Sequence, residues 1–479
     1  MNIGIVFYFL GWVLGIEGIL MILPCVVALI YQEPSGFYFL GVALFCGISG
    51  WLLAHKKLKS TVFYAKEGFV AVSLSWIVLS FFGALPFFLS GEIPLLEDAL
   101  FEVISGFTTT GASVLSDVEA LSRCMLMWRS FTHWIGGMGV LVFILAVLPL
   151  AGGYNIHIMR AESPGPSVGK LVPRVRTTAK ILYLIYLFIT VVQIILLLFT
   201  GMPLFDSMAM SFGTAGTGGF GIVNSSCGDY TALQQWIFTI FMILFGVNFN
   251  VYYLFLIRKP KDALRCEEMR GYLGIILVST LLITWNIRGM FPNILTALRH
   301  AAFQVGSIIT TTGYSTTDFD LWPGFSKTIL VSLMFIGACA GSTGGGIKVS
   351  RIAIAVKTVN KELSSLIHPR NVKVLKYEGK PIEHNVLRSI NTYLVAYILI
   401  FVVSLLLISL DNFDLTTNFT AIAATLNNIG PGLEKVGPTC NFGIFSPFNK
   451  YILMFDMLAG RLELFPMLLL FSPRTWMRE

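Results

Sequence analysis

The chain has 479 residues, of which 55% are hydrophobic and only 12% charged, and its mean hydropathy is +0.77. A soluble domain carries about 25% charged residues, so this composition excludes an ordinary soluble protein and predicts a polytopic α-helical membrane protein. The net charge of +7 reflects the division of charge between loops and not a nucleic-acid-binding surface. The seven cysteines form no CxxC pair, which argues against a metal site.

Positive charge is concentrated on one side of the expected membrane. When the loops are assigned alternately to the two sides, 25 of the 33 lysines and arginines fall on one side, in residues 56–66, 160–180, 258–270, 348–388 and 474–478. The positive-inside rule makes this side cytoplasmic and places both termini there. No basic segment precedes the first apolar run, so we expect a retained helix and not a signal peptide.

The chain begins with two apolar segments, residues 3–30 and 37–54, joined by a turn at 32–36. We expect residues 1–66 to form a pair of transmembrane helices outside the repeats described next. Glu17 is the only acid within the two segments. We expect its carboxyl group to be hydrogen-bonded to a neighbouring helix, and the alternative is an ion site.

Four short stretches then recur, each after an apolar run too short to cross a bilayer. They read Thr109-Thr110-Gly111-Ala112, Thr217-Gly218-Gly219-Phe220, Thr311-Thr312-Gly313-Tyr314 and Asn428-Ile429-Gly430-Pro431. Their reference glycines are 108, 94 and 117 residues apart. This near-even spacing predicts one unit repeated four times, over residues 67–160, 161–265, 266–365 and 366–479.

Each repeat has the same predicted order of elements. A spanning helix (69–90, 180–201, 271–287 or 389–410) precedes a short helix and the glycine stretch, and a return segment follows (125–150, 233–257, from 325, or 449–471). A capping residue stands 13 residues before the glycine in three repeats, as Asp98, Asp206 and Thr417. In the third repeat that offset falls on His300, and Asn293 is an earlier possible cap.

The physics of such a unit favours a cation pathway. A helix of about 12 residues covers about 18 Å and cannot cross the hydrocarbon core of about 30 Å, so it must re-enter. Non-helical backbone is tolerated in a membrane only where it lines water or an ion or is buried in protein. Four helix C-termini, each with about half a negative charge, would point at the stretches. Carbonyl rings there could replace the hydration shell of a cation.

On these motifs the chain resembles the Trk/Ktr/HKT superfamily of potassium transporters, and in particular its TrkH-type membrane subunits. The resemblance covers residues 70–471 and is carried by residues 107–112, 216–220, 309–314, 427–432, 341–348 and 460–463. It implies an all-α membrane protein with four helix–pore-loop–helix repeats around one central pore, preceded by two extra transmembrane helices.

The resemblance also implies a selectivity filter. Its stretches, called filter stretches below, are Thr109-Thr110-Gly111, Thr217-Gly218-Gly219, Thr311-Thr312-Gly313 and Asn428-Ile429-Gly430. Potassium would bind at Thr110, Gly111, Gly218, Gly219, Thr312, Gly313, Ile429 and Gly430. Relatives that pass sodium tend to have serine at the first glycine, so Gly111 favours potassium.

Two features are expected below the filter. Five glycines within residues 337–346 should break the third return helix. A phosphate-binding loop needs GK[ST] after a strand, and Gly346-Ile347-Lys348 does not match. The resemblance instead implies a flexible intramembrane loop that closes the pore through Gly344, Gly345 and Gly346. Arg461 should sit near mid-membrane and face the pore, and the alternative is a salt bridge with Glu463 or Asp456.

The sequence therefore predicts potassium uptake across the bacterial inner membrane. The resemblance implies a homodimer that carries a TrkA-type cytosolic ring, which binds nucleotide and NAD(H), and residues 348–388 are available for docking it. No covalently bound cofactor and no nucleic-acid partner are expected. The alternative function is a proton-coupled carrier for another small solute. A membrane enzyme is disfavoured, because no HExxH motif or paired carboxylates accompany His133 and His300. Proton symport and a Cys227–Cys440 disulfide both stay open.

Overall fold

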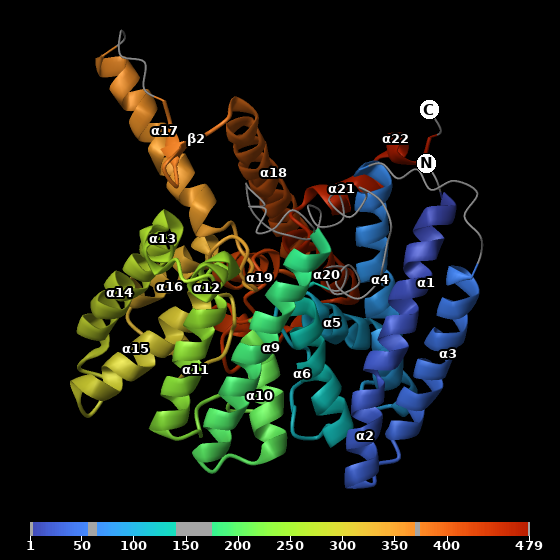
Figure 1. The fold of residues 1–479 in the computed structure, drawn as a ribbon. Helices are drawn as coiled ribbons and strands as arrows, with labels where there is room; N and C mark the ends of the chain where they lie inside the picture. Colours follow the sequence, from blue (N-terminus) through green and yellow to red (C-terminus); the bar gives the residue numbers. More distant parts are fainter. Residues whose placement is uncertain (1–2, 56–64, 140–174, 369–373, 478–479) are drawn as a thin grey trace.

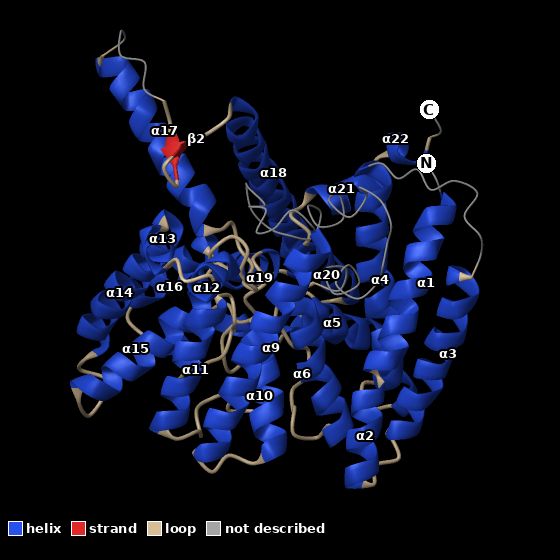
Figure 2. Cartoon of the chain, in the orientation of Figure 1, coloured by secondary structure: helices blue, strands red, loops and turns tan. Residues whose placement is uncertain are grey.

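The computed structural model describes residues 3–55, 65–139, 175–368 and 374–477. Helices dominate this part of the chain (Figure 2), and its only strands are the two-residue pair β1 (Lys376–Tyr377) and β2 (Lys380–Pro381). Both chain ends lie at the end of the molecule from which α17 (Val349–Ile367) projects (Figure 1). The fold is therefore the expected all-helical one with one small hairpin added.

The first apolar segment forms two helices, α1 (Ile3–Leu20) and α2 (Ile22–Tyr31), and the second forms α3 (Gly36–Ala54). Glycines bring α1 and α3 into backbone contact: a Cβ added at Gly11 would lie 2.8 Å from the carbonyl oxygen of Gly50. Close approach of this kind is how small residues pair membrane helices.

Glu17 is fully buried where α1 meets α4 (Ala65–Ser90). Its Oε1 atom lies beside Gly83, with Val103 and Phe107 at the same point. Neither carboxyl oxygen has a hydrogen-bond partner among the described residues. The expected hydrogen bond to a neighbouring helix is therefore wrong, because the groups gathered there are apolar.

The first two repeats follow. Repeat 1 consists of α4, α5 (Leu96–Phe107) and α6 (Arg123–Gly137), and residues 140–150 of its predicted return segment lie outside the described residues. Repeat 2 consists of helices α9 (Val175–Phe199), α10 (Leu204–Gly216), α11 (Ala232–Phe245), α12 (Phe249–Leu256) and α13 (Pro260–Arg265). Its return segment is not continuous, because α12 bends from α11 by 88°.

Repeat 3 contains α14 (Glu267–Ile287), α15 (Ile294–Ile309), the 3₁₀ turn η1 (Phe319–Leu321), α16 (Gly324–Ile336) and α17. The glycine-rich segment predicted to break the return helix does so: residues 337–348, called the intramembrane loop below, separate α16 from α17.

Repeat 4 begins with the hairpin, and its elements are α18 (His384–Ile408), η2 (Ser409–Asp411), α19 (Leu415–Leu426), η3 (Glu434–Val436), η4 (Phe442–Ile444), α20 (Pro447–Arg461), α21 (Phe465–Phe471) and α22 (Pro473–Trp476). The prediction of one helix over 449–471 is wrong. Glu463 and Leu464 take positive φ, and a new helix begins at Phe465 with Pro466 as its second residue, since the ring nitrogen of Pro466 cannot donate to the preceding turn.

The short helices α5, α10, α15 and α19 are called pore helices below. Their predicted caps at Asp98, Asp206 and Thr417 are wrong, because each of these residues stands three positions inside its helix. The N-terminal flanking residues are Leu95, Pro203 and Asp414. Asn293 does cap α15, accepting from Thr296 N. The 13-residue offset failed in repeat 3 because α15 has 16 residues where the others have 12 or 13.

Packing arranges the repeats in a ring. Each pore helix lies between the return helix of its own repeat and that of the preceding one. Thus α5 packs on α6 and α20, α10 on α11 and α6, α15 on α16 and α11, and α19 on α20 and α16. The contact of α5 with α20 joins repeat 4 back to repeat 1, so the order around the ring is 1, 2, 3, 4.

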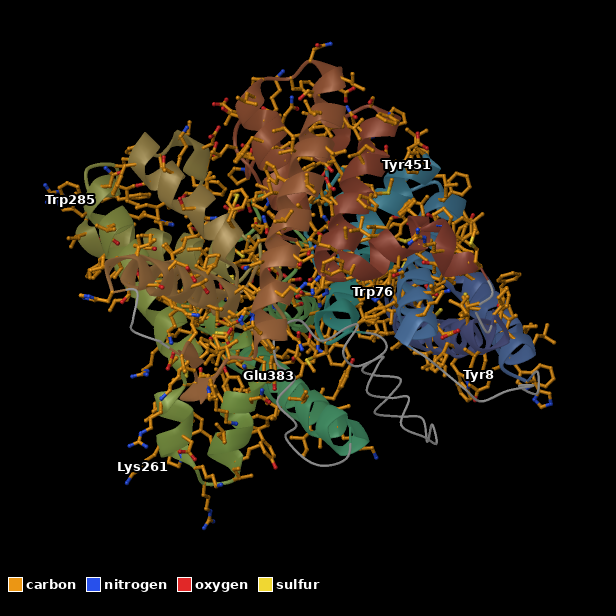
Figure 3. The ribbon with its side chains drawn as sticks, turned by 90° about the horizontal axis from the view of Figure 1, so that it is seen from above. Tyr8, Trp76, Lys261, Trp285, Glu383 and Tyr451 are labelled. Carbon is orange, nitrogen blue, oxygen red and sulfur yellow. The ribbon has the colours of Figure 1, made fainter. Side chains whose placement is uncertain are left out.

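The outer surface suits a lipid environment. Among the described residues, six helices are long and apolar enough to cross a membrane, or seven if α11 and α12 form one bent span. Large apolar side chains point outward from these helices, and Trp285 and Tyr451 lie at the edge of the molecule seen from above (Figure 3). The pore helices are shorter, and their C-terminal halves are buried.

Candidate functional site

The four filter stretches share one backbone conformation. The first residue of each has φ between 54° and 58°, and the glycine two positions later has φ between 78° and 103°. These first residues are Thr109, Thr217, Thr311 and Asn428. The residue between them is not left-handed, so handedness alternates along each stretch. The stretches are therefore not extended strands.

This conformation is strained at threonine. Left-handed φ is a genuine outlier for a β-branched residue and costs on the order of 1–3 kcal/mol. Such strain persists only where the surrounding structure determines it. Thr109, Thr217 and Thr311 are fully buried, so the packing around the ring holds them in place.

The glycines show that the stretches close a ring. A Cβ added at Gly111 would lie 1.9 Å from the carbonyl oxygen of Gly218, and one at Gly219 would lie 1.9 Å from that of Thr312. The same construction at Gly313 meets Ile429 O at 2.1 Å, and at Gly430 it meets Thr110 O at 2.9 Å. Each filter glycine thus faces the carbonyl group of the residue that precedes the filter glycine of the next repeat. The glycine of repeat 4 faces repeat 1 in the same way, which closes the ring.

A single vestibule opens over this ring. All four filter glycines line it, together with residues that follow the filter stretches in each repeat, among them Ser113, Asn224, Ser315 and Asn441. The loops that line it, such as those joining α5 to α6 and α10 to α11, lie at the opposite end of the molecule from the chain termini (Figure 1). Cys440 lines the vestibule as a free thiol, and Cys227 is a buried free thiol.

On the other side of the ring lies the intramembrane loop. Gly345 N donates to the Oγ1 of Thr311 at 2.6 Å. A Cβ at Gly344 would lie 2.8 Å from Thr310 O, and one at Gly345 would lie 2.5 Å from Asn427 O. The structure thus brings the loop glycines against the inner ends of the third and fourth filter stretches.

The loop is fastened to the break in repeat 2. Cys339 N donates to Gly246 O at 3.1 Å, and the hydroxyl of Thr343 donates to Phe245 O at 3.2 Å. In return, Phe249 N donates to Gly341 O at 3.0 Å. The bend between α11 and α12 exposes the backbone groups that make these bonds.

Arg461 is the last residue of α20 and bridges three repeats. Its guanidinium donates to Thr343 O of the loop at 2.9 Å, and to Gly137 O at 2.9 Å and Gly136 O at the end of α6. A cation is favoured at a helix C-terminus. The acids considered as its salt-bridge partners have other partners, since Glu463 pairs with Arg351 and Asp456 accepts from Ser404.

Sequence reasoning missed Glu268, which joins the two ends of the loop. This carboxylate is 4% exposed and accepts from Ala340 N at 2.7 Å and from Ser350 N at 3.2 Å. Glu378, in the turn of the hairpin, accepts from Glu268 N at 3.0 Å. An acid in the first turn of α14 was visible in the sequence, but only as a helix-dipole partner.

The two histidines have structural partners. His133 lies beside Gly218, and Phe220 N donates to its Nε2 at 3.2 Å, so Nδ1 carries the proton that is donated to Gly106 O at 2.8 Å. The Nδ1 of His300 lies 2.8 Å from the Thr316 hydroxyl. Among the described residues, no group of His, Cys, Asp and Glu could hold a metal ion.

Comparison with known proteins assigns this chain to a family. A family model named TrkH, cation transport protein, matches residues 36–287 and 289–477. The chain belongs to the TrkH family of cation transport proteins. Its first 35 residues, which include α1 and α2, lie outside the match.

Individual TrkH-family members are similar over nearly their whole length. The chain is 40% identical to the Trk system potassium uptake protein TrkH of Salmonella typhimurium and 39% identical to that of Escherichia coli K12, over 95% of each chain. The crystal structure of the potassium transporter TrkH from Vibrio parahaemolyticus matches with a TM-score of 0.89 and 33% identity, covering all of both chains. The fold is thus the TrkH fold throughout.

Proposed function

We propose that the chain takes up K⁺ across the bacterial inner membrane through the ring of filter stretches. The closed ring of glycine and carbonyl contacts around a single vestibule is the observation that carries this proposal. Potassium is the ion in the names of the Salmonella and Escherichia coli relatives. K⁺ would lose its water at the ring and be held by the carbonyls of the second and third residues of each stretch, with the first residue supporting them.

Orientation follows from charge. The basic side, with both termini, α17 and the hairpin, faces the cytoplasm, and the vestibule faces outward. The pore helices then direct their C-termini at a dehydrated cation. Anion carriers direct helix N-termini at their substrate, so this arrangement favours a cation over the anions that a carrier of the alternative kind would take.

The intramembrane loop would act as the gate. Its glycines 344 and 345 lie against the inner end of the ring, Gly346 lies beside Gly337 at the start of the loop, and Arg461 donates to Thr343 O. Opening then requires the loop to release Thr311, Arg461 and the break in repeat 2 together. A cation leaving the ring would also meet the positive charge of Arg461, whose repulsion is strong at low dielectric.

Control would come from a cytosolic partner. We infer a homodimer that docks a TrkA-type ring binding nucleotide and NAD(H) on the basic segment 348–388. The hairpin would connect the docked ring to the intramembrane loop. Glu378 of the hairpin accepts a hydrogen bond from Glu268 N at the start of α14, and the carboxylate of Glu268 accepts one from Ala340 N of the loop. Seen from above, Glu383 just after the hairpin lies nearer the centre of the molecule than Lys261 (Figure 3).

Ion flux into proteoliposomes tests the proposal. The purified chain should pass K⁺ in preference to Na⁺ and should pass no anions, and its flux should rise when the regulatory ring is added with nucleotide. A proton gradient imposed with equal K⁺ on both sides and no membrane potential separates passive flux from symport, because only symport then drives net K⁺ uptake. Anion flux, or uptake of another solute in place of K⁺, would replace the proposed function with that of a carrier.

A further inference from the structure

A buried ion pair lies behind the first two filter stretches. The Nε of Arg129 in α6 lies 2.5 Å from Oε1 of Glu102 in α5, and the side chains are 3% and 0% exposed. Both side chains therefore lie inside the protein. A pair buried this deeply is costly in desolvation and tends to be matched by well-placed hydrogen bonds.

Hydrogen bonds to Glu102 come from the segment that follows the first filter stretch. The carboxylate of Glu102 accepts from the Ser113 hydroxyl at 3.0 and 3.1 Å and from Val114 N at 3.1 Å. Ser113 and Val114 are the second and third residues after Gly111. Glu102 therefore fixes the outer end of the first filter stretch.

Arg129 reaches the second stretch at the corresponding point. Its Nη1 donates to Gly221 O at 2.8 Å, and the guanidinium stacks over the ring of Phe220, 3.6 Å from the centroid. Phe220 and Gly221 directly follow Gly219. One ion pair thus joins the outer ends of two neighbouring filter stretches, and Ser113 and Gly221 both line the vestibule.

The other repeats have no charge at these positions. Nine residues before the filter glycine, where repeat 1 has Glu102, the chain has Met210, Gln304 and Ala421. Seven residues after the N-cap of the return helix, where repeat 1 has Arg129, it has Phe238, Leu330 and Leu453, all fully buried. These positions are filled by apolar residues except for the neutral Gln304, so stability alone does not require charge there, and the charged pair in repeat 1 calls for a separate reason.

We propose that Glu102 and Arg129 are positioning residues for selectivity, which hold the first and second filter stretches at the spacing that fits dehydrated K⁺. The proposal rests on the filter assigned above. The strained backbone of Thr109 and Thr217 must be held from outside, and this pair binds the chain within three residues of Gly111 and Gly219. Neither side chain touches the ion, so both act through the backbone.

The test compares two charge-neutralising double variants in proteoliposomes. Glu102→Gln with Arg129→Met removes both charges at once, which avoids leaving one buried charge unpaired. The matched control is Asp98→Asn with Lys450→Met, because Lys450 and Asp98 form another largely buried pair, at 2.5 Å, that ties α20 to the far end of α5. We expect the K⁺/Na⁺ flux ratio to fall several-fold in the first variant and to stay unchanged in the second.

A folded first variant with an unchanged ratio overturns the proposal, provided that Gly111→Ser lowers the ratio in the same assay. If Gly111→Ser also leaves it unchanged, the filter assignment itself fails. If the double variant does not fold, Ser113→Ala decides, since it removes only the hydroxyl bonded to Glu102. A lowered ratio in Ser113→Ala supports the proposal, and an unchanged ratio overturns it.

Discussion

The amide of Gly345 donates directly to the side chain of Thr311, so the intramembrane loop is hydrogen-bonded to the filter itself. The same threonine is held at a left-handed φ of 58°. Movement of the loop would therefore release a contact on one of the strained residues that shape the ring. The proposed gate and the proposed filter therefore adjoin through a hydrogen bond, and a change in one should be measurable in the other.

Gly111→Ser should lower the K⁺/Na⁺ flux ratio several-fold. The new Cβ would stand 1.9 Å from Gly218 O, so the ring must widen or twist. Gly91→Ser is the matched control, because Gly91 has the same φ of +78° and no atom within 4 Å of an added Cβ. An unchanged ratio in folded Gly111→Ser would remove Gly111 from the filter.

Arg461→Ala should raise K⁺ flux in the absence of any partner, since it removes the bonds to Thr343 O and to the end of α6. Deletion of Gly344–Gly346 should do the same by removing the backbone below the ring. If both lie on one barrier, the combined change should gain less than the sum of the single effects, because contacting sites are not additive. Unchanged partner-free flux in both folded variants would place the gate elsewhere.

Glu268→Ala should also raise partner-free flux, by roughly tenfold, because the loss of two hydrogen bonds costs about 1–3 kcal/mol. The matched control is Glu267→Ala. That neighbour pairs with Lys357 in α17. Equal flux from the two variants would show that the bonds from Glu268 to Ala340 and Ser350 do not hold the gate.

Neutralising Lys373, Lys376 and Lys380 together should weaken co-purification of the cytosolic ring and leave selectivity unchanged. Lys376 and Lys380 lie on the two strands of the hairpin, while Lys373 lies outside the described residues. Neutralising Arg258, Lys259 and Lys261 removes the same charge from another basic segment and serves as the control. Equal retention of the ring in both variants would contradict docking on the hairpin.

The repeat was visible in the sequence because its cause is local. A backbone that must take positive φ selects glycine, and four such glycines at even spacing identify the unit. The glycine-rich break before α17 was predicted for the same kind of reason. The break at the end of α20 was not predicted. Pro466 lies beyond this break, and its effect on the helix depends on the conformation of the turn that precedes it.

Contacts between distant segments were not visible. Arg129 and Glu102 are 27 residues apart, and the pattern around each indicates only a helix. Glu268 bonds to residues 72 and 82 positions away. The capping errors at Asp98, Asp206 and Thr417 have a different origin. An acid or a threonine is favourable both at the N-cap and at the third position of a helix, so the residue type does not distinguish the two positions.

The ring is less tight at one joint. A Cβ added at Gly430 would lie 2.9 Å from Thr110 O, whereas at the other three glycines the distance from an added Cβ to the facing carbonyl oxygen is 1.9–2.1 Å. The fourth stretch also differs in sequence, since it reads Asn-Ile-Gly. In a pore built from four identical subunits, one codon change alters every quarter together. Here each quarter is encoded separately, so one side of the ring can change in sequence while the other three stay as they are, and the fourth stretch already differs from the others.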